Sequence, residues 1–539
     1  MERSEWYVNK GAKLELEILW RIAVKTHRII LVVTALLALC LPWGSSAILA
    51  SSHGKTLRIL NSYKCASIDP AKSGSHWLFD WAATDTFMKV TETGAIVPHV
   101  LQALDRLDPL RWKLTLRKGI RFQNGKKLDA KAAAAAIQRQ LDKSKRAQLL
   151  LGGSNIKVTG PLELIIETPR PNASVPNALA ARNASLFVYD TEVMEAANGD
   201  MSKIVGAGAF TAPYEIVAYN PEYFKLKRNK NYWAGMPALE QIEIQVVPDE
   251  QARIKAVQSG EADLAFYPPF EAAFTLKHKK NAFFKVSEKA LQSLLIYINL
   301  RTHPFDNATI RRAFSMGINY REIAEDVSEG IFAEAKGIYP YDLPYTVKNQ
   351  RFDPEKAKQL LDQEGWKPGK NGIRYKNGKP LTASILLSPR GPEVKTVCIA
   401  IQNQLSKIGM DIKLDVREDS RGYQRENLLG WNSSIGLTGS LSGTGDYIQP
   451  FIRRFTTKGD WNFGGINDQR IDTIAEKLQT TLDVPKQYEL LKQAQKILVD
   501  EQVYILSSTF KKFMVVTSPE WKNYQVSSYR RHITWETAP

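Results

Sequence analysis

The chain has 539 residues, of which 44% are hydrophobic and 24% are charged, proportions that exclude an intrinsically disordered chain and allow the large core of two or three domains. The formal net charge of +17 would suit anionic ligands, a membrane surface or nucleic acid. The basic residues are scattered, however, and no lysine run exceeds two residues, so the pattern favours a solvated basic surface and we expect no nucleic-acid partner.

Residues 1–50 are predicted to be a signal peptide with an unusually long N-terminal extension. Residues 29–41 (IILVVTALLALCL) form an apolar run shorter than the roughly 20 residues that span a bilayer. Basic residues precede this run, and Ser45–Ala47 supplies small residues where a signal peptidase would cleave. We therefore expect export to the periplasm or another extracytoplasmic compartment. A lipid anchor at Cys40 is not favoured, because Leu39 is too bulky for a typical lipobox.

Export would leave two cysteines, Cys65 and Cys398, in the mature chain. They are so far apart that the sequence shows no disulfide framework, although pairing in an oxidising compartment stays open. Cys398 shares helical spacing with apolar neighbours, which favours a buried thiol at that position.

The first predicted elements are a strand, a hairpin and a helix. The strand begins with Leu57 and Ile59. Apolar residues alternate through 112–116, and Asn124–Gly125 then supplies a tight turn. Asp129 precedes an alanine-rich run and is predicted to cap a helix.

The segment from Tyr214 to Phe266 is the most informative part of the chain. Alternating or continuous apolar residues predict four strands, near 214–218, 224–226, 242–246 and 262–266. Asp249 can cap the helix between the last two strands, and Gly260 can end it.

Further helices are predicted in the second half of the chain. Asn307 caps one, and Asp353 with Pro354 begins another. Gly409 stops a third helix, which leads into a strand at Ile412–Val416. Strands that alternate with helices in this way indicate mixed α/β domains.

Several blocks of the sequence resemble the family 5 extracytoplasmic solute-binding proteins of ABC importers, the peptide- and nickel-binding group. The family carries Pro-Tyr, then Asn-x-x-Tyr-Trp-x-Gly-x-Pro, then Ser-Gly-Glu-x-Asp. This chain has these motifs at Pro213–Tyr214, Asn229–Pro237 and Ser259–Asp263, and the block 114–130 is also similar. One departure is Ala212, where the family often has a glycine, and this restricts the backbone there.

The resemblance implies an α/β fold with the two lobes of a class II-like periplasmic binding protein, an extra small domain and a discontinuous first lobe. The implied first lobe comprises 52–95, 210–298 and 512–539. A small inserted domain would occupy 96–209, and the second lobe 299–511.

The sequence offers no catalytic or metal-binding motif. GxSxG, HExxH and CxxC patterns are absent, and the seven histidines lie far apart. We therefore predict that the chain is not an enzyme and needs no metal and no cofactor. A secreted hydrolase that uses scattered carboxylates is a remote alternative.

The glycine-rich stretch 430–450 (GWNSSIGLTGSLSGTGDYIQP) would, on its residues alone, be an ordinary flexible loop. In peptide-binding members of the family, an Asp in a similar box before a Pro holds the ligand's α-ammonium group. The resemblance implies this role for Asp446, flanked by Gly445 and Tyr447. A carboxylate suits the role because charge-assisted hydrogen bonds are stronger than neutral ones. Trp431 is a further candidate for ligand contact.

Two more candidates come from other loops. In dipeptide-binding members of the family, an Arg serves the peptide's terminal carboxylate, and Arg390, in a Pro-Gly loop, is the nearest match. A solvated surface arginine is the alternative at that position. Ser75, in the first loop, is a weaker candidate for lining the binding cleft.

The resemblance thus implies the substrate-binding component of an ABC importer, which captures a small peptide between two lobes and delivers it to a membrane permease. A nickel chelate, haem, an opine or an oligosaccharide stays open as the ligand, as does a ligand sensor without transport. We expect a monomer whose partners are a small-molecule or peptide ligand and the permease.

Overall fold

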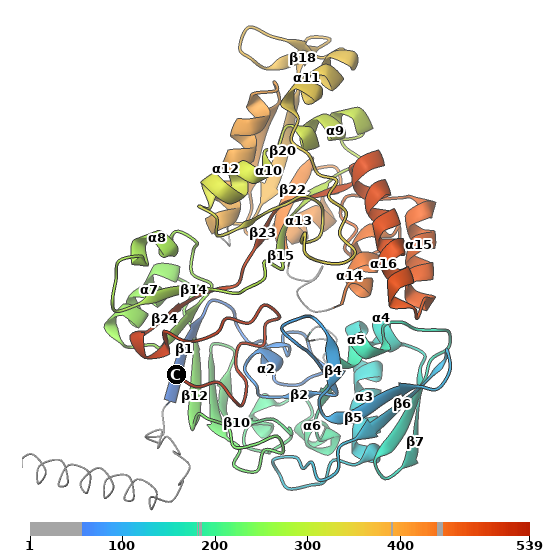
Figure 1. Ribbon diagram of the computed structural model, residues 1–539, viewed down its shortest axis with the longest axis vertical. Coiled ribbons are helices and arrows are strands. Elements are labelled where there is room, and N and C mark those ends of the chain that lie inside the picture. The colour runs from blue at the N-terminus through green and yellow to red at the C-terminus, as the bar shows by residue number, and fades with distance from the viewer. Residues whose placement is uncertain (1–55, 181, 183–185, 390–391, 439–445) are drawn as a thin grey trace, which may run out of the picture. The chain divides into compact units, whose positions relative to one another are not determined.

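The computed structural model describes residues 56–180, 182, 186–389, 392–438 and 446–539 (Figure 1). The predicted signal peptide and the candidate residues Arg390 and Gly445 lie outside the described residues. In the described part of the chain, no helix is long and apolar enough to cross a membrane.

A seven-stranded mixed sheet forms the first lobe, in the order β10–β11–β12–β1–β13–β24–β14. Its strands are β1 Thr56–Asn61, β10 Tyr214–Asn220, β11 Tyr223–Arg228, β12 Gln241–Val246, β13 Leu264–Phe266, β14 Phe283–Val286 and β24 Met514–Thr517. β1 runs parallel to β12 and β13, with Leu57 opposite Ile242 and Ile59 opposite Leu264. Alternate residues of β1, β11 and β12 are buried, as the period-2 pattern predicted, and they join one hydrophobic core. The helices of this lobe include α2 Trp77–Asp80, α6 Thr191–Ala197, α7 Glu250–Ser259 and α8 Ala272–Leu276.

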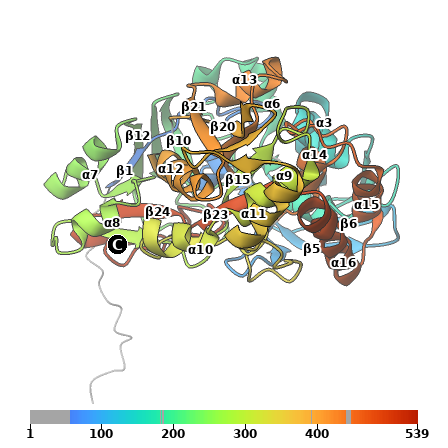
Figure 2. The same cartoon turned by 90° about the horizontal axis from the view of Figure 1, so that it is seen from above.

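A six-stranded sheet forms the second lobe, in the order β16–β23–β15–β22–β20–β21. Its strands are β15 Gln292–Ile298, β16 Ala333–Glu334, β20 Thr382–Leu387, β21 Asp411–Val416, β22 Ser433–Thr438 and β23 Ile505–Lys511. Every residue of β15 and β23 is buried, because both strands are covered on two faces. Helix α12 packs against β20, β21 and β22 (Figure 2). The helices of this lobe are α9 Ala308–Met316, α10 Tyr320–Glu322, α11 Pro354–Gln363, α12 Pro392–Ser406, α13 Ser420–Glu426, α14 Ile448–Phe455, α15 Gln469–Thr480 and α16 Val484–Gln495.

A smaller antiparallel sheet, in the order β5–β6–β8–β7, has a hydrophobic core of its own. It consists of β5 Leu101–Arg106, β6 Arg111–Leu116, β7 Asn155–Gly160 and β8 Glu163–Glu167, with helices α3 Ala130–Lys143, α4 Lys145–Leu151 and α5 Val175–Ala180. The carboxylate of Asp129 accepts a hydrogen bond from the Ala132 N–H at 2.9 Å, which confirms the predicted cap of the alanine-rich helix.

Two segments of chain connect the first sheet to the second. Residues 287–291 join β14 to β15, and residues 512–513 join β23 to β24. The Ser287 N–H donates to the Phe513 carbonyl oxygen at 2.9 Å, and the Phe513 N–H donates to Ser287 Oγ at 2.9 Å. The connection therefore consists of two short segments hydrogen-bonded to each other between strands, a suitable place for a hinge.

The domain boundaries expected from the sequence need correction at two places. The range 210–298 was assigned to the first lobe, but β15 pairs with β22 and β23 of the second sheet. Its continuous apolar run suits the two-sided burial of a central strand, and the pairing with β22 and β23 places it in the second sheet. In the expected insert 96–209, Phe187 and Met194 instead pack into the core of the first lobe.

The other predicted helix ends are confirmed. The Asp249 carboxylate accepts from an N–H of the first turn of α7, and Gly260 ends that helix with a φ of +80°. Asn307 and Asp353 cap α9 and α11 in the same way. Each cap satisfies N–H groups that the helix itself leaves unbonded.

Both remaining cysteines, Cys65 and Cys398, are buried free thiols. The burial predicted for Cys398 is confirmed, and no disulfide joins the two residues.

Candidate functional site

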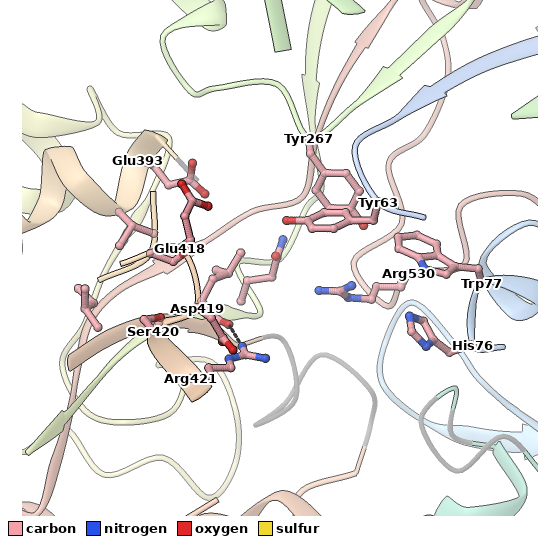
Figure 3. A pocket seen from close by; sticks show the side chains of 16 residues that line it. Tyr63, His76, Trp77, Tyr267, Glu393, Glu418, Asp419, Ser420, Arg421 and Arg530 are labelled. Atoms are coloured by element: carbon pink, nitrogen blue, oxygen red, sulfur yellow. Dashed lines mark hydrogen bonds between the residues drawn. The ribbon is translucent and has the colours of Figure 1, made fainter. Parts of the chain in front are cut away.

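A cavity of about 450 Å³ lies where residues of the first lobe face residues of the second (Figure 3). Small-molecule sites typically have volumes of about 300–1,000 Å³. The first lobe contributes Tyr63, His76, Trp77, Tyr267 and Arg530. The second lobe contributes Gln292, Ser388, Glu393, Val394, Glu418, Asp419, Ser420, Arg421, Ile435, Gly436 and Leu437.

An aromatic stack forms much of the first-lobe wall. The ring of Tyr63, in the loop after β1, stacks on Trp77 with 6.1 Å between centroids, and Trp77 stacks on Trp81 at 5.8 Å. Tyr267, just after β13, meets Tyr63 edge-on at 5.0 Å. Because Tyr63 is 45% exposed, its ring can contact a ligand directly.

A buried ion pair supports this stack from behind. Arg182 donates from two guanidinium nitrogens to the two carboxylate oxygens of Asp80, and both side chains are buried. The Arg182 guanidinium also lies 5.4 Å from the centroid of the Trp77 ring. The pair thus neutralises charge in the interior while it fixes the aromatic wall.

Arg530 reaches the cavity from the C-terminal segment that follows β24. In the part of the chain that the structure describes, its guanidinium makes no hydrogen bond or ion pair and lies over the Phe513 ring at 4.8 Å. Burial lowers the pKa of Arg530. Its φ is +63°, a left-handed conformation that costs a non-glycine residue about 1–2 kcal/mol. Backbone strain of this kind clusters at ligand sites, and an unpaired arginine is suited to an anion.

Three further atoms of the cavity residues are buried polar atoms without a hydrogen-bond partner among the described residues: His76 Nδ1, the Tyr267 hydroxyl and Gln292 Oε1. Burial, with Arg182 and other nearby arginines, holds the pKa of His76 well below its usual range, so this imidazole is neutral. Because native proteins pair nearly all their buried polar groups, three such atoms at one cavity indicate a site for a polar ligand.

The second-lobe wall carries acidic groups that already have partners. Glu393 pairs with Lys511 at the end of β23, and both side chains are buried. Asp419 accepts a hydrogen bond from the Gly422 N–H at 2.9 Å and so caps α13. Arg421 donates to the Leu437 carbonyl oxygen at 3.4 Å.

In the described part of the chain, the second-lobe wall carries more acidic than basic side chains, because it has three carboxylates and one arginine, Arg421. Arg530 lies on the first-lobe side, and Glu393, Glu418 and Asp419 lie on the second-lobe side, as Figure 3 shows. Such an arrangement can bind a small molecule that carries a negative group at one end and a positive group at the other.

The sequence-derived candidate Asp446 lies outside this lining. It is 4% exposed, and its Oδ1 accepts from the N–H groups of Ile448 at 2.9 Å and Gln449 at 3.2 Å. The same oxygen accepts from Asn177 Nδ2 at 3.3 Å. The carboxylate thus satisfies the first N–H groups of α14, and its predicted contact with a ligand ammonium stays a prediction.

Three other candidates also lie outside the cavity lining. The ring of Tyr447 packs 5.1 Å from that of Tyr345, and Trp431 is 1% exposed within the core of the second lobe. The hydroxyl of Ser75 donates to the Pro70 carbonyl oxygen at 3.0 Å.

Sequence reasoning singled out the stretch 430–450, which contributes Ile435, Gly436 and Leu437 to the lining, but it missed the first-lobe residues that line the cavity. Arg530 follows Ser527–Tyr529 without any motif, and its neighbours in the cavity come from loops far away in the chain. One signal was available. The strands β1 and β13 run parallel in the same sheet, and the loops after them lie at the carboxyl ends of the strands, where ligands of open α/β sheets commonly bind. Within the described residues, no group of three or more His, Cys, Asp or Glu side chains could hold a metal ion.

Residues 95–462 match the sequence model of the bacterial extracellular solute-binding proteins, family 5. The chain is 25% identical over 470 residues to the nickel-binding periplasmic protein of Escherichia coli, covering 84% of this chain and 88% of the relative. It is 26% identical over 413 residues to the glutathione-binding protein GsiB of Salmonella paratyphi A, covering 74% of this chain and 77% of the relative.

Solved structures of two relatives have the same fold. NikA from Staphylococcus aureus, in complex with Ni(L-His)2, has a TM-score of 0.75 at 22% identity and covers 89% of this chain and 99% of its own. The oligopeptide-binding protein AppA from Bacillus subtilis, in complex with a nonapeptide, has a TM-score of 0.69 at 18% identity and covers 89% of this chain and 97% of its own. The mixed α/β architecture is that of the two-lobed periplasmic binding proteins. This chain belongs to the family 5 bacterial extracellular solute-binding proteins, the substrate-binding proteins of ABC transporters.

Proposed function

We propose that this protein captures a small peptide in the cavity between its lobes and delivers it to the membrane permease of an ABC importer. The observation that carries the proposal is the opposed chemistry of the two walls. Arg530 has no partner among the described residues, and Glu393, Glu418 and Asp419 face it. A short peptide with free termini carries both charges that such walls would bind.

Arg530 would bind the peptide's carboxylate. Its planar guanidinium can donate two parallel hydrogen bonds to the two oxygens, and it gives up no existing hydrogen bond among the described residues. The Tyr267 hydroxyl and His76 Nδ1 lie on the same wall and would gain partners from the same end of the ligand.

The second-lobe wall would bind the ammonium end. Gln292 Oε1 is a buried acceptor without a partner among the described residues, and Glu418 and Asp419 supply negative charge. Closure around the peptide would exclude water, which strengthens these charge interactions. Because only the closed state contacts both ends, binding would favour closure.

The second candidate ligand is a nickel chelate formed by an amino acid such as histidine. One observation favours it: His76 is neutral, and its Nδ1 has no partner in the described chain, so it could complete the coordination of a chelated metal. Arg530 would then bind the chelator's carboxylate. The metal would be cargo.

The proposal also includes how the protein works in the cell. It would be exported, would act as a monomer, and would bind its ligand reversibly without changing it. The ABC permease would be its protein partner, and no resident cofactor is needed for capture and release.

Calorimetric titration of the purified mature protein tests the ligand class. Unmodified dipeptides are expected to bind at least tenfold more tightly than their C-terminally amidated forms, with maltose as an inert control. Binding of Ni(L-His)2 without any binding of dipeptides would show that the ligand is the second candidate, a nickel chelate. Binding of none of these probes would refute the proposal, and cleaved peptides in the mass spectrum would indicate a hydrolase.

A further inference from the structure

A small side cavity of about 30 Å³ adjoins the main cavity within the second lobe. The two cavities share five lining residues: Ser420, Arg421, Ile435, Gly436 and Leu437. The side cavity continues from these residues to Tyr297, Trp461 and Phe463. It therefore lies where part of a ligand in the main cavity would point into the second lobe.

Gly436 lies at the junction of the two cavities, in the middle of β22. It lies opposite Leu295 in the antiparallel pair of β22 with β15. Glycine in the interior of a strand lowers stability, because it has no side chain to pack. The φ of Gly436 is not positive, and a Cβ built there meets no atom within 4 Å. Neither the backbone nor the packing therefore requires glycine at this position. The missing side chain leaves space at the boundary between the two cavities, both of which Gly436 lines.

Among the described residues, the lining of the side cavity is partly aromatic, and its one charged residue is Arg421; of the arginines behind Trp461, Arg453 is paired with Asp460 at 2.6 Å. The rings of Tyr297 and Phe463 meet edge-on at 5.6 Å. The guanidinium groups of Arg421, Arg453 and Arg454 lie 5.5, 4.4 and 4.4 Å from the Trp461 ring centroid. The residues that line the side cavity include no acidic side chain.

These walls set the chemistry of a group that enters. A Lys or Arg side chain would meet the like charge of Arg421, and no described residue that lines the side cavity offers a carboxylate to pair with it, which is unfavourable. A neutral group or an acid is compatible. The volume of about 30 Å³ has room for about two water-sized groups, since one such group needs about 10–15 Å³.

We propose that the side cavity is a specificity subsite that takes a small, neutral or acidic side chain of the bound peptide, and that Gly436 keeps its entrance open. This inference rests on the proposed peptide-binding function. It narrows the substrates to short peptides with a small uncharged or acidic residue at one position, and it excludes Lys, Arg and large aromatic residues there.

The test uses the dipeptides X-Ala and Ala-X, where X is Gly, Ser, Lys or Phe, in calorimetric titrations of the mature protein. At one of the two positions, the wild type is expected to bind Ser at least tenfold more tightly than Lys or Phe. In Gly436→Ala, the added methyl group narrows the entrance, so the Ser peptide loses at least fivefold in affinity while the Gly peptide stays within twofold.

Gly160→Ala is a matched control. Gly160 is the last residue of β7 and, like Gly436, has no positive φ; the atoms nearest to a Cβ there belong to the Glu163 side chain, at 3.7 Å or more, and neither cavity is lined by Gly160. The Gly160→Ala variant is expected to show the same ratios of dipeptide affinities as the wild type. Both variants should keep the wild-type melting temperature, because neither added methyl group clashes.

Equal affinities of the wild type for Ser, Lys and Phe at both positions would overturn the subsite. Equal losses of affinity for the Gly and Ser peptides in Gly436→Ala would also overturn the subsite. Either result would still be consistent with the proposed binding of peptides. If the wild type binds none of the dipeptides, the proposed function itself fails and the subsite fails with it.

Discussion

The two walls of the cavity differ in how much of their polar chemistry is already in use. On the second-lobe wall, Glu393 is paired with Lys511, and Asp419 caps a helix. On the first-lobe wall, Arg530 and the Tyr267 hydroxyl have no hydrogen-bond partner in the described part of the chain. A ligand can therefore make new hydrogen bonds on the first wall, whereas on the second Gln292 Oε1 has no partner among the described residues but Glu393 and Asp419 already have partners.

Because the two walls differ in this way, we expect the two lobes to contribute differently to ligand binding. A group without a partner gains the most from a ligand, so we expect the first-lobe wall to supply most of the affinity. The second-lobe wall is held in shape by its own internal pairs. We expect it to complete the site on closure and to select among ligands.

The largest expected effect comes from breaking the buried pair in the second-lobe wall. Glu393→Ala leaves Lys511 charged and unpaired in the interior, so the free energy of unfolding should fall by about 4 kcal/mol in urea titrations followed by circular dichroism. The double variant Glu393→Leu with Lys511→Met removes both charges and should stay within about 1 kcal/mol of the wild type. A single variant as stable as the wild type would mean that this wall does not depend on the pair.

The next effect concerns the ligand-facing arginine. Arg530→Gly should weaken binding of an unmodified dipeptide by about 3 kcal/mol, roughly 100-fold, because the peptide carboxylate loses its charged partner. The C-terminally amidated dipeptide should lose much less. The same change should stabilise the ligand-free protein by about 1 kcal/mol, since glycine adopts the left-handed conformation at φ +63° without strain.

Glu329→Gly is the matched control for that variant. Glu329 is an exposed residue with a φ of +47° and does not line the cavity. It should gain similar stability and keep the wild-type affinity. Equal affinity losses in the two variants would show that the effect of Arg530→Gly comes from the backbone.

A smaller effect distinguishes the capping carboxylate from the ligand site. Burial raises the pKa of Asp446 above its ordinary value of 3.8. The native state thus binds this proton more tightly than the unfolded state does. The contribution to stability is full below about pH 4 and is lost as the pH rises through the raised native pKa.

Asp446→Asn should remove this pH dependence and raise the melting temperature at pH 7, because asparagine caps a helix about as well as aspartate. Thermal melts from pH 4 to pH 8 measure the effect. Peptide affinity should stay within twofold of the wild type. A loss of roughly 100-fold would instead support the ammonium-binding role that the sequence suggested for Asp446.

The smallest expected effect tests whether the lobes are covalently tied. Cys65 follows the first-lobe strand β1, and Cys398 lies in α12 of the second lobe. Burial raises the pKa of Cys65 to about 12 and raises that of Cys398 as well, so both stay protonated and unreactive. Dithiothreitol should leave the melting temperature unchanged. A fall of several degrees would indicate a disulfide between the lobes.

Individual helices and strands could be predicted from the sequence because their signals are local, whereas the two-lobed arrangement was implied by the family resemblance. Asp249 and Gly260 bound a helix through caps that depend on neighbouring residues alone, and alternation in 242–246 reports a strand with one buried face. The placement of β15 could not be predicted in this way. Its continuous apolar run fits the interior of either sheet, and only the pairing with β22 and β23 decides between them.

The site was less predictable because its residues meet through tertiary structure. Arg530 comes from the last residues of the chain, and Tyr63 from the loop after the first strand, with no shared motif. Resemblance directed attention to Asp446, whose carboxylate caps α14 in the structure and whose contact with a ligand stays a prediction. A motif can identify a residue type at a position, but it does not report which way the side chain points.

A crystal structure of the mature protein with an unmodified dipeptide tests the central claim most directly. The account predicts the peptide carboxylate within hydrogen-bonding distance of the Arg530 guanidinium, and its ammonium group on the side of Glu418 and Asp419. A peptide bound in the opposite orientation, or one whose carboxylate lies away from Arg530, would contradict it.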